Sequence, residues 1–217
     1  MEIAFSFDIN YVNQTKVSIS SLYKHNSDLS LLLLVVGKKS EFQNFEQWLK
    51  NKNAVYRIIE IDDYFDNTAF KGSGRHIKTV YSKFFIPEIS TNERTLYLDS
   101  DTFVKCSITE LNNLSFSNKI LAMAITPTND LVEHYKLTTK KFYNDGVVLL
   151  NNKMCRSFNL KEKILKEFKL NNNNPLYLSE GLINKVAEGN IKDIPPRYNM
   201  LSGNIWIVNN NLKNYIN

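Results

Sequence analysis

The sequence contains little cysteine. Its 217 residues include two cysteines, Cys106 and Cys155, which is too few for a disulfide framework, and their spacing does not suggest a metal site. We expect both thiols to be free and buried, in a protein that resides in a reducing compartment.

Long hydrophobic runs are also absent. The longest purely apolar run is LLLLVV, residues 31–36, which is far too short to cross a bilayer. The N-terminal stretch MEIAFSFDINY has acids at positions 2 and 8 and no basic region, so it predicts a first core strand rather than a signal peptide. We expect a cytoplasmic protein without a transmembrane segment; peripheral membrane contact stays open.

Neither sign of charge dominates the chain. The formal net charge is +5, a mild bias toward anionic partners that is too small and too scattered to indicate nucleic-acid binding. The lysines of LKEKILKEFKL, residues 160–170, alternate with apolar residues, which is typical of a solvated helix face. We expect no nucleic-acid partner.

The chain does contain enough apolar material for a full core. Hydrophobic residues make up 43% of the sequence and charged residues 23%, the balance of an ordinary soluble domain. Strand-like and helix-like patterns alternate, with strands predicted at 3–8, 29–37 and 54–61 and helices at 13–25 and 40–51, the second capped by Ser40. Because the strand runs are nearly continuous in apolar residues, we predict an α/β domain with a mostly parallel, twisted sheet and helices on both faces.

The second half of the chain is less regular. After a glycine-containing loop, a helix is expected within residues 76–89, ending near Pro87. Further strands are predicted at 95–98, 119–126 and 144–152, and helices at 160–170 and 179–188. No repeat or internal boundary is evident, so residues 1–217 are expected to form one domain.

One predicted strand ends on two acids. The stretch RTLYLDSDTFV, residues 94–104, runs into Asp99 and Asp101, which are separated by Ser100. In an open α/β sheet, ligands bind beyond the carboxyl ends of the strands, and residues i and i+2 of an extended chain point to the same side. Two neighbouring carboxylates repel each other unless a cation shares them. The pattern suggests a divalent-metal site with positions left for phosphate oxygens, or else a strand-end turn with one aspartate capping the next helix and the other solvated.

Five stretches of the chain are similar, in order, to motifs of the family 8 retaining glycosyltransferases, the group of glycogenin and the bacterial lipopolysaccharide galactosyltransferases. They are FSFDINYV (5–12), RHIKTVYSKFFIPE (75–88), LYLDSDTFV (96–104), FYNDGVVLLN (142–151) and IPPRYN (194–199). The resemblance covers nearly the whole chain, and five motifs at compatible spacing are a stronger signal than any one of them. It implies a single GT-A-type domain.

The resemblance also implies roles for particular residues. Asp8, Asn10 and Tyr11 would bind the base and ribose of a UDP-sugar. Asp99 and Asp101 would hold Mn²⁺ (or Mg²⁺) against the diphosphate of that donor. For Asp8 and Asn10, the alternative is helix capping after a strand.

Further residues are implied to line the donor sugar and the acceptor. Ser100 would face the ribose, Asn144 and Asp145 would line the donor-sugar and acceptor side, and Asp145 is a candidate catalytic residue. His76 aligns with a substrate-side position. Lys83 stands where the family usually has arginine, which keeps a positive charge near phosphate or sugar but loses the bidentate fork; the alternative is an ordinary exposed lysine.

Two departures from the family pattern concern the catalytic region and the C-terminus. The family usually carries Asp-Gln-Asp before Leu-x-Asn, where this chain has Ser179, Glu180 and Gly181. Glu180 would replace the glutamine proposed to lie under the anomeric carbon, where a carboxylate can stabilise an oxocarbenium-like centre or attack it. It can equally be a capping-box partner or a solvated acid. The chain also stops at Asn217 without the family's C-terminal His and Lys-Pro-Trp segment, the source of a third metal ligand.

These patterns favour a retaining glycosyltransferase that moves a hexose, glucose or galactose, from a UDP-sugar to a glycan or lipid-linked glycan acceptor. A haloacid-dehalogenase-type phosphatase is one alternative, although Phe103 stands where that motif has threonine. The other alternative is a catalytically impaired nucleotide-sugar-binding homologue or a fragment of a longer protein.

Overall fold

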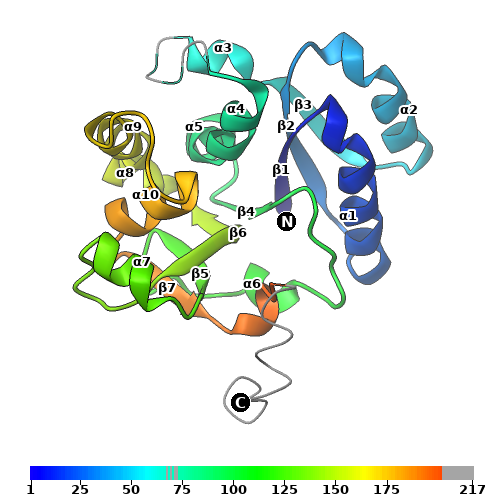
Figure 1. Ribbon diagram of the computed structural model, residues 1–217. Coiled ribbons are helices and arrows are strands. Elements are labelled where there is room, and N and C mark those ends of the chain that lie inside the picture. Colours follow the sequence, from blue (N-terminus) through cyan, green and yellow to red (C-terminus); the bar gives the residue numbers. More distant parts are fainter. Residues whose placement is uncertain (67, 69, 71–72, 202–217) are drawn as a thin grey trace.

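The protein's structure, a computed structural model, contains a seven-stranded sheet with the strand order β3-β2-β1-β4-β6-β5-β7 (Figure 1). It describes residues 1–66, 68, 70 and 73–201. The strands are β1 (Glu2–Asp8), β2 (Ser30–Val36), β3 (Val55–Glu60), β4 (Arg94–Leu98), β5 (Leu121–Ile125), β6 (Tyr143–Asn151) and β7 (Ile191–Ile194). β6 runs antiparallel to β4 and β5, and the other neighbouring pairs are parallel. The prediction of a mostly parallel sheet is therefore confirmed.

Helices cover both faces of this sheet, as the sequence predicts. One face carries α1 (Val12–His25), α2 (Gln43–Asn51) and α6 (Thr109–Asn112). The other face carries α3 (Asp62–Phe65), α4 (Arg75–Tyr81), α5 (Ile86–Ile89), α8 (Asn152–Phe158), α9 (Leu160–Leu170) and α10 (Leu178–Val186), visible together in Figure 1. Around α7 (Asn129–His134) a small separate apolar cluster forms. No helix in the described part of the chain is long and apolar enough to cross a membrane.

The two cores follow from the alternation of side chains along the strands. In β2, Leu31 and Leu33 enter the core under α1 and α2, whereas Leu32 and Leu34 enter the core on the opposite face. Successive side chains of a strand point to opposite faces, so a strand covered on both faces must be apolar at nearly every position. The continuous apolar run at 31–36 thus reflects a strand that is buried on both sides.

Three local predictions need correction. Ser40 does not cap a helix, because a 3₁₀ turn, η2 (Lys39–Phe42), precedes α2, and the backbone N–H of Lys38 donates instead to the carboxylate of Glu41 at 2.8 Å. Pro87 lies in the first turn of α5, where a missing N–H costs nothing, and the helical segment breaks earlier into a second 3₁₀ turn, η3 (Ser82–Phe85). Cys106 is exposed, so one of the two thiols is not buried.

Candidate active site

The strand order brings the carboxyl ends of β1 and β4 side by side. The chain leaves β1 toward β2 on one side and returns at β4 on the other, which makes this pair of strands a topological switch point, where open α/β sheets bind ligands. Asp8 ends β1, and Asp99 directly follows β4. Ser100 ties the two strands together, because its buried hydroxyl donates to the carbonyl oxygen of Ser6 at 2.8 Å.

The two aspartates of the Asp-x-Asp motif have different surroundings. Tyr97 donates its hydroxyl to Asp99 Oδ1 at 2.8 Å, and Lys83 Nζ lies 3.8 Å from the same oxygen. Burial raises the pKa of Asp99, Lys83 opposes this rise, and the carboxylates of Asp145 and Asp101 add to it. Asp101 is exposed and makes no hydrogen bond or ion pair with any described residue. Neither aspartate caps a helix, since the next helix begins only at residue 109.

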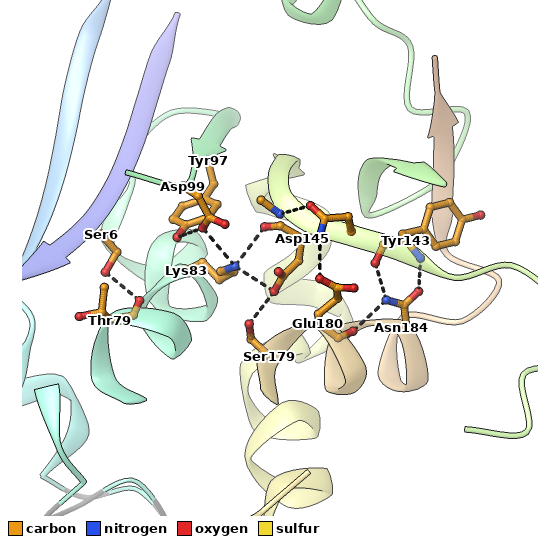
Figure 2. Close-up of polar contacts among 12 residues, drawn as sticks. Ser6, Thr79, Lys83, Tyr97, Asp99, Tyr143, Asp145, Ser179, Glu180 and Asn184 are labelled. Atoms are coloured by element: carbon orange, nitrogen blue, oxygen red, sulfur yellow. Dashed lines mark hydrogen bonds and ion pairs between the residues drawn. The ribbon is translucent and has the colours of Figure 1, made fainter. Parts of the chain in front are cut away.

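Lys83 is buried at the centre of the site, so its interpretation as an ordinary exposed lysine is wrong. Only 3% of the residue is exposed. Its Nζ lies 2.8 Å from Asp145 Oδ2 and donates to the Asp145 carbonyl oxygen at 3.0 Å (Figure 2). Burial alone lowers a lysine pKa, but the carboxylates of Asp145 and Asp99 outweigh it and raise the pKa of Lys83. The Lys83 side chain therefore stays positively charged and faces these two carboxylates.

The start of α10 places Ser179 and Glu180 against the same cluster (Figure 2). Ser179 donates its hydroxyl to Asp145 Oδ2 at 2.6 Å, and Asn144 Nδ2 donates to Glu180 Oε2 at 2.8 Å. Burial and the charge of Asp145 raise the pKa of Glu180 to about 8, although Lys83 acts in the opposite direction. Glu180 thus faces Asp145 of β6, and a pKa of about 8 leaves it protonated at neutral pH, rather than being a capping-box partner or a freely solvated acid.

Two glycines make room for close approaches within the site. A Cβ at Gly146 would lie 3.0 Å from Asp99 Oδ2 and 3.0 Å from Asn144 Oδ1, so a side chain there would push the two groups apart. A Cβ at Gly181 would overlap the hydroxyl of Tyr135, which donates to the Leu176 carbonyl oxygen across that position. The second aspartate of the family pattern therefore cannot be accommodated at position 181 in this packing.

The residues predicted to bind the nucleotide lie at the end of β1. Asp8 caps the 3₁₀ turn η1 (Ile9–Tyr11), because its Oδ1 accepts the backbone N–H of Asn10 at 2.9 Å. This is the capping role foreseen as the alternative for Asp8. Asn10 and Tyr11 are exposed beside it. His76 is exposed on α4 and makes no hydrogen bond or ion pair with the described residues, so it is not brought into the carboxylate cluster.

Sequence reasoning missed several members of the site. Tyr97 was identifiable, because it stands two residues before Asp99 in extended chain at the end of β4, and alternation places both side chains on one side. Asn199 and Asn184 stand in the motifs IPPRYN and Leu-x-Asn, but these motifs do not indicate what the two side chains contact. Asn199 Nδ2 donates to Asn144 Oδ1 at 2.7 Å, and the side chain of Asn184 exchanges hydrogen bonds with the Tyr143 backbone (Figure 2). These contacts join segments that lie 41 and 55 residues apart in the chain.

The two aspartates suit a hard divalent cation as a partial ligand set. Asp99 Oδ2 accepts no hydrogen bond from a described residue, and Asp101, two residues on, is exposed and unpaired within the same part of the chain. Carboxylate oxygens are the donors that Mg²⁺ and Mn²⁺ take, and a cation would relieve the repulsion that raises the pKa of Asp99. Within the described residues there is no group of three or more His, Cys, Asp or Glu ligands, so diphosphate and water would have to complete the coordination.

Comparison with known proteins gives matches along most of the chain. The model of the family described as glycosyl transferase family 8 matches residues 2–216. Glycosyltransferase GlyD of Streptococcus pneumoniae is 28% identical over 76% of this chain and 19% of its own length. Glycosyltransferase GlyE of the same organism is 24% identical over 93% of this chain and 48% of its own length. The chain thus spans half or less of the length of these two relatives.

The fold is also that of a solved glycosyltransferase. The galactosyltransferase LgtC, crystallised in complex with donor and acceptor sugar analogues, superposes with a TM-score of 0.83 at 20% identity. The match covers 96% of this chain and 78% of LgtC. Identity at this level shows a shared architecture, and it leaves the chemistry to be argued from the residues themselves.

Proposed function

The chain belongs to glycosyltransferase family 8, and from this premise we propose that it transfers a hexose, glucose or galactose, from a UDP-sugar to an acceptor hydroxyl with retention of anomeric configuration. Family membership removes the support for the phosphatase alternative. One observation carries the proposal. At the β1–β4 edge, Asp99, the first acid of the Asp-x-Asp motif, lies next to a buried Lys83–Asp145 pair, and Glu180 faces that pair.

Binding of the donor is proposed to use both sides of this edge. Asn10 and Tyr11, exposed after β1, would contact the base and ribose, while Asp8 holds the turn that presents them. Asp99 and Asp101 would hold Mn²⁺ or Mg²⁺ against the diphosphate, where the cation supplies positive charge that offsets the charge developing on departing UDP.

Lys83 and Asp145 are proposed to position the sugar rather than to contact the phosphates. Lys83 is occupied by the side chain and carbonyl oxygen of Asp145 and is nearly inaccessible. It therefore neutralises Asp145 and holds the start of β6 in place. Ser179 adds a second donor to the same carboxylate oxygen, so a serine keeps Asp145 satisfied where the family's aspartate would repel it.

Glu180 is the proposed group under the anomeric carbon. Its pKa of about 8 leaves the carboxyl neutral at pH 7, as the amide of the family's glutamine is. A neutral carboxyl offers a carbonyl oxygen to positive charge developing on the sugar. Ionised above pH 8, the same group becomes a carboxylate that can attack the anomeric carbon as the bond from that carbon to the UDP oxygen breaks and UDP leaves. Asp145 remains a second candidate for contact with the donor sugar or acceptor.

The acceptor is proposed to be a glycan or a lipid-linked glycan in the cytoplasm, with peripheral membrane contact during transfer. Support comes from LgtC, which shares the fold and was crystallised with an acceptor sugar analogue. The charge of +5 would favour approach to an anionic lipid surface.

A thermal-shift panel tests the proposal. UDP, UDP-glucose and UDP-galactose should each raise the melting temperature in the presence of Mn²⁺, and one of the sugars should be released slowly from UDP when no acceptor is added. Absence of any UDP-dependent shift at millimolar ligand would contradict the proposal. Binding without release, with or without glycan acceptors, would instead identify a nucleotide-sugar-binding module without turnover.

A further inference from the structure

The side-chain amide of Asn144 has one possible orientation. The backbone N–H of Gly146 points at one of its terminal atoms from 3.0 Å, and a backbone N–H can only donate, so that atom is the oxygen. The NH₂ group of Asn144 must then be the one that faces Glu180 Oε2, at 2.8 Å. Asn144 is thus a fixed donor to Glu180.

A second donor, Asn199, reaches the side-chain oxygen of Asn144 from a distant segment of the chain. Asn199 Nδ2 lies 2.7 Å from Asn144 Oδ1 and 3.3 Å from the Asn144 backbone oxygen, so its NH₂ group bridges both acceptors. Asn199 follows the 3₁₀ turn η4 (Pro196–Tyr198), which Arg197 ties to Glu110 at 2.9 Å. The donor therefore sits on an anchored segment of the chain.

We propose that Asn199 is a positioning residue of the transfer site, which orients the Asn144 amide so that Asn144 donates its N–H to the Glu180 carboxyl. The expected effect on turnover rests on the proposed function, because the orientation of the Asn144 amide affects the rate only if Glu180 takes part in sugar transfer. The hydrogen-bond relay itself, from Asn199 through Asn144 to Glu180, stands independently of that function. Asn199 contacts neither Glu180 nor the Asp-x-Asp carboxylates.

The relay has a measurable effect because Glu180 is sensitive to its surroundings. The charged groups that face it are Asp145 on β6, Lys83 on η3 and Asp99 after β4. A donor to a carboxylate stabilises its ionised form. Loss of the Asn144 donor should therefore raise the pKa of Glu180 further above about 8, and it should slow any step in which Glu180 faces positive charge on the sugar.

The test combines a titration with kinetics. Carboxyl-¹³C NMR of glutamate-labelled protein, free of metal and nucleotide, follows the midpoint of Glu180, whose signal is assigned with Glu180→Gln. We expect Asn144→Ala to raise this midpoint, Asn199→Ala to raise it by a smaller amount because the Gly146 N–H still holds Asn144 Oδ1, and the double variant to raise it no further than Asn144→Ala, because both substitutions act on one relay. Asn199→Asp, which sets an oxygen against Asn144 Oδ1, should shift it at least as much as Asn199→Ala. Asn190→Ala is the matched control, because the Asn190 side chain donates only to the Glu188 backbone oxygen, and it should leave the midpoint unchanged.

In kinetic assays, Asn199→Ala should lower the rate of sugar release roughly tenfold, the scale of one hydrogen bond to a reacting group, while affinity for UDP itself stays unchanged. An unchanged Glu180 midpoint in Asn199→Ala, with a shifted midpoint in Asn144→Ala, would overturn the inference whether or not the protein turns over UDP-sugars. A shifted midpoint in a protein that releases no sugar would support the relay and overturn the proposed function.

Discussion

Replacing Lys83 with methionine is expected to destabilise the protein strongly and in a pH-dependent way. Lys83 and Asp145 are 3% and 6% exposed, and their charged atoms lie 2.8 Å apart. Removing one partner of a buried ion pair leaves an uncompensated charge and costs about 3–5 kcal/mol. That is a large share of the roughly 5–15 kcal/mol by which domains are stable.

The expected size of the effect makes it easy to measure. For a domain of this length, each kcal/mol changes the melting temperature by about 2–4 °C, so Lys83→Met should melt about 6–20 °C below the wild type at pH 8. Lys50 is the matched control, because it pairs with Glu46 at 3.6 Å but is 58% exposed. Lys50→Met should cost about 0–1 kcal/mol.

Acidification should reduce the penalty of Lys83→Met. Burial raises the pKa values of Asp99 and Glu180, and Lys83 holds both values down. Without Lys83, Asp99 and Glu180 stay protonated in the folded state at pH values where the unfolded chain has already lost these protons. The free energy of unfolding of the variant therefore falls as pH rises. The difference from wild type should be greatest near pH 8 and shrink toward about pH 4, the ordinary range of carboxyl groups.

Chemical unfolding of Lys83→Met and wild type at pH 5, 6, 7 and 8 checks this reasoning. A penalty below about 1 kcal/mol, or one that does not change between pH 5 and pH 8, would refute the view that Lys83 compensates a buried carboxylate cluster. Lys50→Met in the same series separates this effect from the general loss of a surface lysine.

Three further outcomes are expected. Asp101→Asn should change the free energy of unfolding by less than about 0.5 kcal/mol, because Asp101 is exposed and unpaired among the described residues. The same variant should lose the Mn²⁺-dependent part of the UDP thermal shift. Retention of that shift would argue against a metal ligand at this position. The free energy of unfolding of Glu180→Gln, relative to wild type, should increase as pH rises from about 4.5 to about 8 and then level off. The reason is that the raised pKa of Glu180 makes its ionisation costly in the folded state. Unfolding free energies of the two proteins that run parallel with pH in denaturant titrations would contradict this. Gly181→Ala should destabilise by at least about 1–3 kcal/mol, because a Cβ there overlaps the Tyr135 hydroxyl and the Leu176 backbone oxygen. Tyr135→Phe in the same chain removes only the first overlap and should restore a small part of the loss in calorimetry.

Much of the architecture could be predicted from local patterns. The apolar runs at 3–8 and 31–36 identified strands that are buried on both faces, whereas the run at 54–61 forms the partly exposed edge strand β3. The position of Asp99 and Asp101 at the carboxyl end of β4 was predictable for the same reason, because strand ends and alternation are properties of consecutive residues. Helix capping was less predictable. Ser40 does not cap a helix, and the carboxylate of Glu41 accepts the backbone N–H of Lys38 instead.

The state of the candidate site was not predictable in this way. The resemblance singled out Lys83 as a positive charge near phosphate or sugar, but not as a buried cation, which it becomes because the chain brings Asp145 to it from 62 residues away. Ser179 looked like a loss of the family's aspartate, yet it donates to Asp145 from another helix.

Which segments form strands, and which acids stand at their ends, is thus encoded in short stretches of this chain. Whether Glu180 is charged, which groups Lys83 neutralises and which way the Asn144 amide points depend on the folded arrangement. The physical reason is that protonation and hydrogen bonding depend on burial and on distances of about 3 Å between atoms from β6, η3, α10 and the segment after η4. No pattern of neighbouring residues specifies such distances.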